Sequence, residues 1–561
     1  MDSRRRQLIR ATGAVLGAPF LTRGGVDTWA HGAPNPDGGG DRLYNGIQLP
    51  AEWPPRYTTV PAREPMMVPY LHHLPEVIPI DLGRQLFVDD FLIEPSTLTR
   101  RYHSTTYASG NPILTADKPW ESEPLRKEPP TRRAMTFSDG VWYDPQERIY
   151  KMWYMAGVNR YTCYATSSDG LRWNKPALDV VPGTNIVSRL GRDSSTVWLD
   201  QFESDPSKRY KMFLYQRPED SAQMSLFFSA DGMHWSDLVA KSGPTRDRCT
   251  AFYNPFRKVW VFSIKATTPR EFGRRRQYRE HPDVVQGIKW RAGEPHMWVG
   301  ADWLDKGRPE YGVYPELYNL DAVAYESILL GLFIIWTGEG GAGRPKPNQV
   351  FVAFSRDGFH WHRPNREPFV PVSDTAGSWN YGNVQSAGGC CLIVGDRLHF
   401  YVSGREGVPG TDRPGVCNTG LATLRRDGFA SMDAGDADGH VTTRPVLFSG
   451  RHMFVNVDTP TGELRVEVLD PDRKPIEPYT RDNALAIRVD STRQRVRWNG
   501  AADLARLAGS PVRFRFHLRR GRLYAFWVSK SDAGASDGYV AAGGPGFTGP
   551  IDAAGAGSRS Q

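Results

Sequence analysis

A short motif that occurs three times between residues 164 and 361 constrains the fold more than any other feature of this chain. Each copy has a short apolar stretch, then Ser-x-Asp-Gly, then a Trp three residues after the Gly; the copies span residues 164–173, 227–235 and 351–361. The Asp can accept hydrogen bonds from backbone N–H groups two residues on, and the Gly supplies the positive φ that such turns need. A motif repeated in this way indicates radial or linear repetition of one structural unit.

A second hairpin, with an aromatic or β-branched strand on each side of a polar turn, lies upstream of these turns. It occurs five times, beginning at Val141, Val197, Ala251, Val323 and Leu392. At least three copies continue into the Asp-Gly hairpin, so the chain contains five units of about four strands. This arithmetic predicts an all-β protein with a five-bladed β-propeller over residues 86–438.

The segments around these units differ from them in composition. Residues 439–530 contain strands such as 463–469 that alternate between apolar and charged residues, which predicts a C-terminal β-sandwich. Residues 34–85 are rich in Pro, Gly and polar residues and predict a strap over the surface. Residues 531–561 are mostly Gly, Ala, Ser and Asp and predict a disordered tail. From the expected fold, a strand within residues 85–94 would complete the last blade.

The first 33 residues resemble a targeting segment of the twin-arginine type. Arg4-Arg-Arg6 precedes a weakly apolar stretch, residues 11–21, that is too short to span a bilayer. We therefore expect export to the periplasm or the extracellular space and no membrane span; a frayed basic N-terminus is the alternative. The five cysteines are odd in number and include no C-x-x-C pair, so neither a zinc site nor a disulfide framework is indicated.

The formal net charge of +8 comes largely from Arg. The one basic run outside the N-terminus, Arg274-Arg-Arg276, lies in an insertion of the third unit, where we expect a solvated loop, so binding of nucleic acid is not indicated. Aromatic residues make up 12% of the chain, which suits either stacking on a sugar or packing between blades.

The inner strands of a propeller point toward one axis, so residues at their starts converge although they lie far apart in the sequence. Unit by unit, the polar residues there are Ser138 and Asp139; Arg192 and Asp193; Arg246, Asp247 and Arg248; Glu316, Tyr318 and Asp321; and Trp379, Asn383 and Gln385, with Arg405 and Glu406 at the far end of the fifth hairpin. Like charges that converge repel one another and raise some pKa values, and glycoside hydrolysis uses two carboxyl groups in different protonation states. The alternative is that individual Asp residues cap turns or pair with arginines.

Five aromatic β-units, a trailing β-sandwich and a carboxylate at the entry of successive blades resemble the glycoside hydrolase family 32 and family 43 superfamily, the fructosidases and arabinanases, over residues 86–528. Arg192-Asp193-Ser194 is similar to the Arg-Asp-Pro motif of the fructosidases, whose Asp stabilises the transition state. By position, the family's first-blade Asp, nucleophile in retaining members and base in inverting ones, falls on Asp139. The resemblance leaves two candidates for the general acid, Asp247 and Glu316.

The resemblance and the convergent carboxylates predict an exported glycoside hydrolase that cleaves a glycosidic bond in a plant- or microbe-derived oligosaccharide or polysaccharide. The expected catalytic residues are Asp139, Asp193, Asp247 and Glu316, and the expected substrate-binding residues are Arg192, Arg248, Tyr318, Asp321, Trp379, Asn383, Gln385 and Glu406. Trp142, Trp379 and Tyr318 are candidate stacking surfaces, with packing in the core as the alternative for each. No cofactor or metal is required, although calcium at the axis stays an open alternative, and we expect a monomer or a small homo-oligomer.

Two other classes of function stay open. A non-catalytic carbohydrate-binding propeller would keep the aromatic residues and arginines, but it would not place two carboxyl groups about 5 to 10 Å apart across an open pocket. A propeller used as a protein-interaction scaffold would have a plugged axis and an exposed apolar rim.

Overall fold

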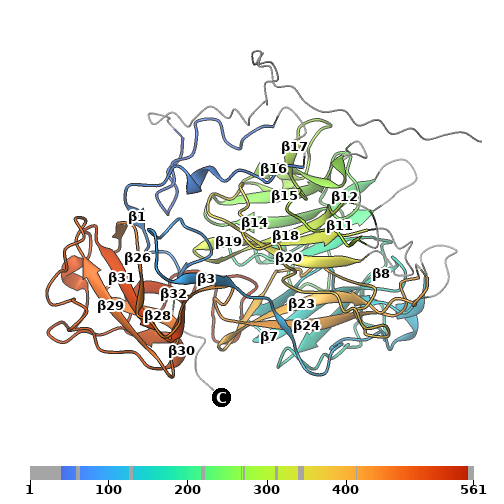
Figure 1. Ribbon diagram of the computed structural model, residues 1–561. Helices are drawn as coiled ribbons and strands as arrows, with labels where there is room; N and C mark the ends of the chain where they lie inside the picture. Colours follow the sequence, from blue (N-terminus) through green and yellow to red (C-terminus); the bar gives the residue numbers. More distant parts are fainter. Residues whose placement is uncertain are drawn as a thin grey trace, which may run out of the picture.

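The computed structural model describes residues 40–57, 63–124, 131–216, 222–266, 268, 272–309, 312, 314–338, 347–411 and 413–553. The expected targeting segment, residues 1–33, lies outside these stretches. Strands dominate the described chain (Figure 1), which confirms the all-β class. Its helical elements include the short helix α1 (Val284–Gly287) and single 3-10 turns at Pro69–Leu71, Pro119–Ser122, Pro206–Lys208 and Ala505–Leu507.

Five antiparallel sheets follow one another along the described chain. Sheet 1 contains β5 (Ala134–Met135), β6 (Val141–Asp144), β7 (Ile149–Ala156), β8 (Tyr161–Ser167) and β9 (Ile186–Ser188), and sheet 2 contains β10 (Ser195–Leu199), β11 (Tyr210–Gln216), β12 (Gln223–Ser229) and β13 (Ala240–Lys241). Sheet 3 contains β14 (Thr250–Asn254), β15 (Val259–Lys265), β16 (Arg275–His281) and β17 (His296–Gly300). Sheet 4 contains β18 (Glu316–Glu326), β19 (Ile328–Trp336), β20 (Asn348–Ser355) and β33 (Tyr539–Val540), and sheet 5 contains β21 (Asn383–Gln385), β22 (Leu392–Val394), β23 (Arg397–Arg405), β24 (Cys417–Arg425) and β4 (Thr106–Tyr107).

Hydrogen bonds join each of these sheets to the next, and the fifth to the first. In ring order, Trp142 Nε1 donates to Val197 O (2.9 Å), Arg248 N to Ser194 Oγ (2.8 Å), Thr250 Oγ1 to Leu320 O (2.5 Å), Ala387 N to Asp321 Oδ2 (3.4 Å) and Phe137 N to Ser403 Oγ (2.7 Å). The first strands of neighbouring sheets contact one another, as β10 and β14 do and as β14 and β18 do. The five sheets therefore form a closed ring with their first strands on the inside.

The Ser-x-Asp-Gly turns form as the sequence predicts. Asp169 Oδ1 accepts hydrogen bonds from the backbone N–H groups of Leu171 and Arg172, both at 2.8 Å, and Asp231 and Asp357 accept the equivalent pairs. The glycine of each turn has a positive φ, of 73°, 81° and 88° in chain order. Each turn is therefore satisfied by hydrogen bonds within its own few residues.

Two of these turns also fasten one sheet to its neighbour. Tyr401 of sheet 5 donates its hydroxyl to the carbonyl of Gly170 at 2.8 Å, and Trp153 of sheet 1 donates Nε1 to the carbonyl of Gly232 at 2.6 Å. A Cβ on Gly232 would lie 2.4 Å from the Trp153 ring, so glycine is required there for contact as well as for conformation. The turns thus stabilise the ring from its outer strands.

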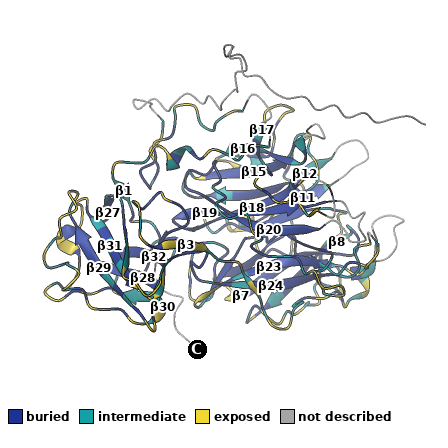
Figure 2. Ribbon diagram, viewed as in Figure 1, coloured by how far each residue is buried: buried dark blue, intermediate teal, exposed yellow. Residues whose placement is uncertain are grey.

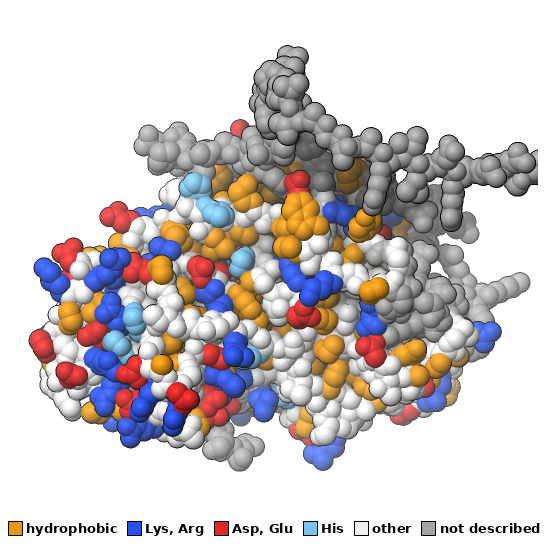
Figure 3. All heavy atoms as spheres, in the orientation of Figure 1, with side chains coloured by type: hydrophobic (Ala, Val, Ile, Leu, Met, Phe, Trp, Pro, Cys, Tyr) orange, Lys and Arg blue, Asp and Glu red, His pale blue; other side chains and the backbone are white. Residues whose placement is uncertain are grey.

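The remaining strands lie beside the ring and include segments from both ends of the chain. Sheet 6 contains β2 (Gln85–Leu86), β3 (Thr99–Tyr102), β25 (Ala430–Ala434), β28 (His452–Asp458), β30 (Asp490–Arg495) and β32 (Gly521–Ser529); sheet 7 contains β26 (Gly439–Thr442), β29 (Glu463–Leu469) and β31 (Arg513–Arg519); β1 (Ile78–Pro79) pairs with β27 (Val446–Leu447). The alternation predicted in residues 463–469 holds from Glu463 to Val466, whereas Glu467 is buried beside His517. Charged side chains of both signs lie on the outside of these sheets (Figure 3).

Two expectations about the flanking segments are wrong in detail. The strand that completes sheet 5 is β4, which pairs with β24, whereas β2 pairs with β32 in sheet 6. Strands β2, β3 and β25 belong to sheet 6, so part of the range predicted for the propeller, residues 86–438, lies in the C-terminal sheets. The long-range pairing of these two- to five-residue strands depends on tertiary packing that their own sequence does not show.

The expected disordered tail is ordered through residue 553. Strand β33 pairs with β18, and Phe547 is buried. A buried ionic network explains the ordering: Arg426 lies 3.0 Å from Glu326 and 3.4 Å from Asp552, and the hydroxyl of Ser536 donates to Glu326 at 2.7 Å. Few apolar residues are needed here because charged side chains from sheets 4 and 5 bind the tail.

The strands of the ring and those of sheets 6 and 7 are buried over much of their length (Figure 2), each around a hydrophobic core of its own. All five cysteines are buried and none forms a disulfide. No helix among the described residues is long and apolar enough to cross a membrane.

Candidate functional site

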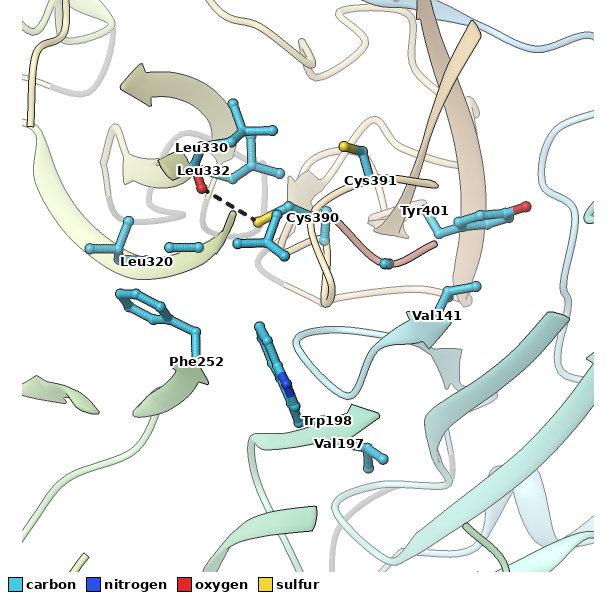
Figure 4. Packing of buried hydrophobic residues seen from close by; sticks show 14 of the residues in the cluster. Val141, Val197, Trp198, Phe252, Leu320, Leu330, Leu332, Cys390, Cys391 and Tyr401 are labelled. Carbon is cyan, nitrogen blue, oxygen red and sulfur yellow. Dashed lines mark hydrogen bonds between the residues drawn. The ribbon is translucent and has the colours of Figure 1, made fainter. Parts of the chain in front are cut away.

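The first strands of the five sheets begin at the same end of the ring, and polar side chains gather there. We call this group the central site; it consists of Phe137, Ser138, Asp139, Arg192, Asp193, Asp247, Arg248, Arg274, Glu316, Tyr318, Asn319, Asp321, Ser386 and Arg405. Apolar side chains lie next to these residues along the chain: Figure 4 shows Val141, Trp198, Phe252 and Leu320, from sheets 1 to 4, and Cys390, from the turn between β21 and β22, packed together. The central site thus lies over an apolar floor.

Both carboxylate oxygens of Asp139 accept hydrogen bonds from Arg192. Arg192 donates Nη1 to Asp139 Oδ1 at 2.6 Å and Nη2 to Oδ2 at 2.7 Å, and both side chains are inaccessible to solvent. Burial raises the pKa of Asp139, although the Arg192 charge opposes this shift. Asp139, the expected base or nucleophile, is therefore held in a bidentate ion pair between sheets 1 and 2.

Asp193 is the more accessible carboxylate, with 19% of its side chain exposed. Its Oδ1 lies 3.2 Å from Arg248 Nη2 and accepts no hydrogen bond within the described chain. The Arg248 guanidinium in turn lies 4.3 Å from the centre of the Phe137 ring, and its Nε and Nη1 are buried without a hydrogen-bond partner. This pair therefore retains unused donors and an unused acceptor.

The other two expected catalytic residues are ion-paired. Asp247 contacts Lys265, and Glu316 Oε2 lies 2.6 Å from Arg274 Nη1 and also accepts from the Arg274 backbone N–H at 3.1 Å. Arg274, Arg275 and Arg276 do not form the solvated loop that we expected, because Arg275 begins β16 and Arg276 is fully buried. Sequence reasoning missed Arg274 as part of the site, since its partner lies forty-two positions away along the chain.

Tyr318 is surrounded by arginines from neighbouring sheets. The Cζ atoms of Arg248 and Arg274 lie 5.6 Å and 5.7 Å from the centre of its ring. Burial alone would raise the pKa of Tyr318, but the charges of Arg248 and Arg405 outweigh burial and lower it. Tyr318 was expected as a stacking residue. In the structure, the guanidinium groups of Arg248 and Arg274 lie over its ring.

Asp321 lies deeper, at the junction of sheets 1, 4 and 5. Its Oδ2 accepts from the Asn319 side chain at 3.2 Å, and the same Asn319 amide donates to Ser138 Oγ at 2.9 Å and Ser386 Oγ at 3.3 Å. Burial raises the pKa of Asp321 to about 6. Asp321 thus keeps its proton into the mildly acidic range. Nothing in the sequence around Asn319 pointed to this network.

The aromatic candidates are packing residues. Trp142 is buried and donates to the next sheet, as described above. Trp379 lies against β23 and β24, where a Cβ on Gly404 or Gly420 would come within 2.1 Å of its ring, and its ring also contacts Tyr107 edge-on at 5.6 Å.

The remaining expected binding residues lie on sheet 5. Asn383 and Gln385 are buried in β21, and Gln385 Nε2 donates to Asn383 Oδ1 at 3.3 Å. Glu406 follows the end of β23 and is partly exposed. Ser386, the residue directly after β21, is the one that reaches the Asn319 network.

Three residues of the central site have a left-handed backbone conformation. Phe137, Arg248 and Ser386 are not glycine, yet they have φ of 41°, 61° and 54°. Such conformations cost energy and persist where the surroundings enforce them, often at binding and catalytic sites. Among the described residues, no group of three or more His, Cys, Asp or Glu side chains is arranged to hold a metal ion.

Comparisons with known proteins give only distant similarity. No family model matches the chain, and no curated protein matches it. Among solved structures, it is similar to a member of a family of mannoside phosphorylases that contains glycoside hydrolases targeting β-1,2 mannosidic linkages in Candida mannan (TM-score 0.38, 13% identity, 59% of this chain and 97% of that one). A glycosyl hydrolase from Bacteroides ovatus (0.38, 13%, 57% and 94%) and a thermostable family-43 glycoside hydrolase (0.36, 12%, 54% and 93%) are similar to the same degree. Similarity this remote says nothing about activity or substrate.

Proposed function

We propose that sheets 1 to 5 are the blades of a five-bladed β-propeller, that sheets 6 and 7 form a β-sandwich, and that the protein is an exported glycoside hydrolase acting at the central site. The observation that carries this proposal is the convergence of charged side chains from all five sheets over an apolar floor, with hydrogen-bonding atoms left unsatisfied on the Asp193–Arg248 ion pair. An ionic cluster built for stability alone would satisfy these atoms, as the Arg192–Asp139 pair does with two hydrogen bonds.

Two carboxyl groups of the site lie in contrasting environments, as acid–base hydrolysis requires. Asp193 is partly exposed and lies beside a guanidinium, which stabilises a carboxylate. Asp321 is buried, and its pKa is raised to about 6. We assign the carboxylate role to Asp193 and the proton-carrying role to Asp321, in place of Asp139 and Glu316, because the latter two are occupied by Arg192 and Arg274.

The same ion pairs favour a second candidate function, binding of a carbohydrate without cleavage. Asp139, Asp247 and Glu316 each face a basic side chain. A binding protein would use the unpaired donors of Arg248 for recognition and would need no free carboxyl pair.

Product release from a panel of fructans, arabinans and uronate-containing glycans tests the hydrolase. We expect the wild type to release product from one class, and Asp193→Asn to lower the rate by about 10²- to 10⁴-fold, the usual contribution of an acid–base group. Asp169→Asn, in an outer turn, is the matched control and should leave the rate unchanged. Full activity in Asp193→Asn would remove this residue from the mechanism; binding of a glycan with no product from any member of the panel would favour the second candidate.

Export depends on residues 1–33, with their paired arginines. Replacement of Arg4, Arg5 and Arg6 by Lys should retain the protein in the cytoplasm of a bacterial host, as fractionation and immunoblotting would show. Unchanged export of this variant would contradict the twin-arginine assignment.

A further inference from the structure

The central site contains guanidinium N–H groups that no described residue satisfies. The Arg248 side chain is 6% exposed; its Nη2 approaches Asp193, while its Nε and Nη1 have no hydrogen-bond partner. The Nε of Arg405 is also buried and without a hydrogen-bond partner. Buried charged donors that stay unpaired are costly, so their retention indicates a ligand that pairs with them.

Both arginines lie close to Phe137 and Tyr318. The Arg248 guanidinium, from sheet 3, lies 4.3 Å from the centre of the Phe137 ring and 5.6 Å from that of Tyr318. Arg405 ends β23 in sheet 5, two residues after Ser403, whose Oγ accepts a hydrogen bond from the Phe137 backbone N–H at 2.7 Å. The charges of both arginines lower the pKa of Tyr318 in sheet 4. Arg274 approaches Tyr318 too, but it is already paired with Glu316 at 2.6 Å. Among these three arginines, Arg248 and Arg405 thus hold buried N–H donors that no described residue satisfies.

Arg248 is held rigidly. Its backbone has a φ of 61°, its guanidinium lies over the Phe137 ring at 4.3 Å, and its backbone N–H donates to Ser194 Oγ at 2.8 Å. A donor that is fixed before binding loses little conformational entropy when a ligand arrives, so this placement favours recognition.

We propose that Arg248 and Arg405 form a subsite for the carboxylate of an acidic sugar, so that the glycan bound at the central site contains a uronate residue. This inference rests on the proposed function in that it concerns the same site. A carboxylate presents two coplanar oxygens, which match the paired N–H groups of a guanidinium, and charge-assisted bonds of this kind are the strongest hydrogen bonds in proteins. A sulfate ester shares the negative charge but not the planar geometry.

Isothermal titration calorimetry with trigalacturonate and its methyl ester tests the subsite, because the two ligands differ in charge and little in shape. We expect the wild type to bind trigalacturonate at least about tenfold more tightly than the ester, the loss expected for one charge-assisted hydrogen bond. Arg405→Met should abolish this difference. Arg397→Met removes an exposed arginine at the opposite end of β23 and should leave the difference intact.

Four results would overturn the subsite: equal binding of acid and ester, no binding of either, an unchanged preference in Arg405→Met, or an equal loss in Arg397→Met. Tighter binding of a sulfated galactotriose than of trigalacturonate would overturn the assignment to a carboxylate. Calorimetry requires no bond cleavage, so acid-selective binding without hydrolysis would contradict the hydrolase alone. Hydrolysis of a neutral glycan without any preference for acid would contradict the subsite alone.

Discussion

The outer Ser-x-Asp-Gly turns and the central site use the same residue types in opposite ways. In the turns, Asp169, Asp231 and Asp357 each accept two backbone hydrogen bonds from their own turn, so the polar groups are satisfied locally. In the central site, Asp193 and Arg248 come from different sheets and keep unpaired atoms. The turns are repeated and self-sufficient, whereas the central site is assembled once, from single contributions of five sheets. This contrast indicates that the turns maintain the fold and the centre carries the function.

Of the ion pairs in the centre, Asp139–Arg192 is the one whose side chains are both inaccessible to solvent, and its disruption should give the largest loss of stability. Arg192→Met leaves Asp139 buried without its partner, and we expect the free energy of unfolding to fall by about 4 kcal/mol, as for other broken buried ion pairs. Urea unfolding measures this. Arg192→Met combined with Asp139→Asn should recover part of the loss; a double variant as unstable as the sum of the single variants would contradict the pairing.

Asp321 provides a test by pH. Its folded-state pKa is raised to about 6 from 3.8, so the folded protein binds this proton more tightly than the unfolded chain does. The free energy of unfolding should therefore fall as the pH rises through that window, by about 3 kcal/mol from this group. Asp321→Asn should match the wild type near pH 4 and exceed its stability at pH 7. Parallel stability curves for the two proteins would contradict the raised pKa.

The turns can be compared with one another. Asp357 is buried and Asp169 has 30% of its side chain exposed, although both accept the same two backbone hydrogen bonds. Asp357→Ala leaves buried N–H donors unpaired and should cost about 2 kcal/mol of stability, against about 1 kcal/mol for Asp169→Ala, where water replaces the carboxylate. Thermal unfolding measures both, and glycan binding should be unchanged in each. Weaker glycan binding by either variant would contradict the claim that the turns maintain the fold and take no part in binding.

The sequence was sufficient for the turns because every bond that defines them lies within a few residues. Sequence reasoning also brought Asp139, Asp193, Tyr318 and Asp321 to one place, since strand starts converge in any ring of this kind. It could not assign roles to the residues of the site, because tertiary structure decides which carboxylates are ion-paired. Glu316, for example, is paired with Arg274.

The ordered tail shows the same limitation. Residues 531–553 have few apolar side chains, and composition alone predicts disorder. Their order depends on Glu326 and Arg426, which lie more than a hundred residues earlier in the chain. A prediction from local composition does not include such partners.

Arg405→Met should have the smallest effect on stability. The buried Nε of this side chain has no hydrogen-bond partner, so its loss should change the free energy of unfolding by no more than about 1 kcal/mol, and the change should be neutral or stabilising, as is common when a functional charge is removed. Thermal unfolding of this variant beside Arg192→Met tests the contrast between a paired arginine and one with an unsatisfied donor. A loss comparable to that of Arg192→Met would show that Arg405 has a structural partner.

Hydrogen exchange with and without saturating trigalacturonate tests the division between turns and centre most directly. We predict slower exchange in peptides that cover residues 192–195 and 246–250, at the starts of sheets 2 and 3, and no change in residues 167–173, 229–235 and 355–361. Slower exchange at the outer turns, with none at the strand starts, would contradict the account.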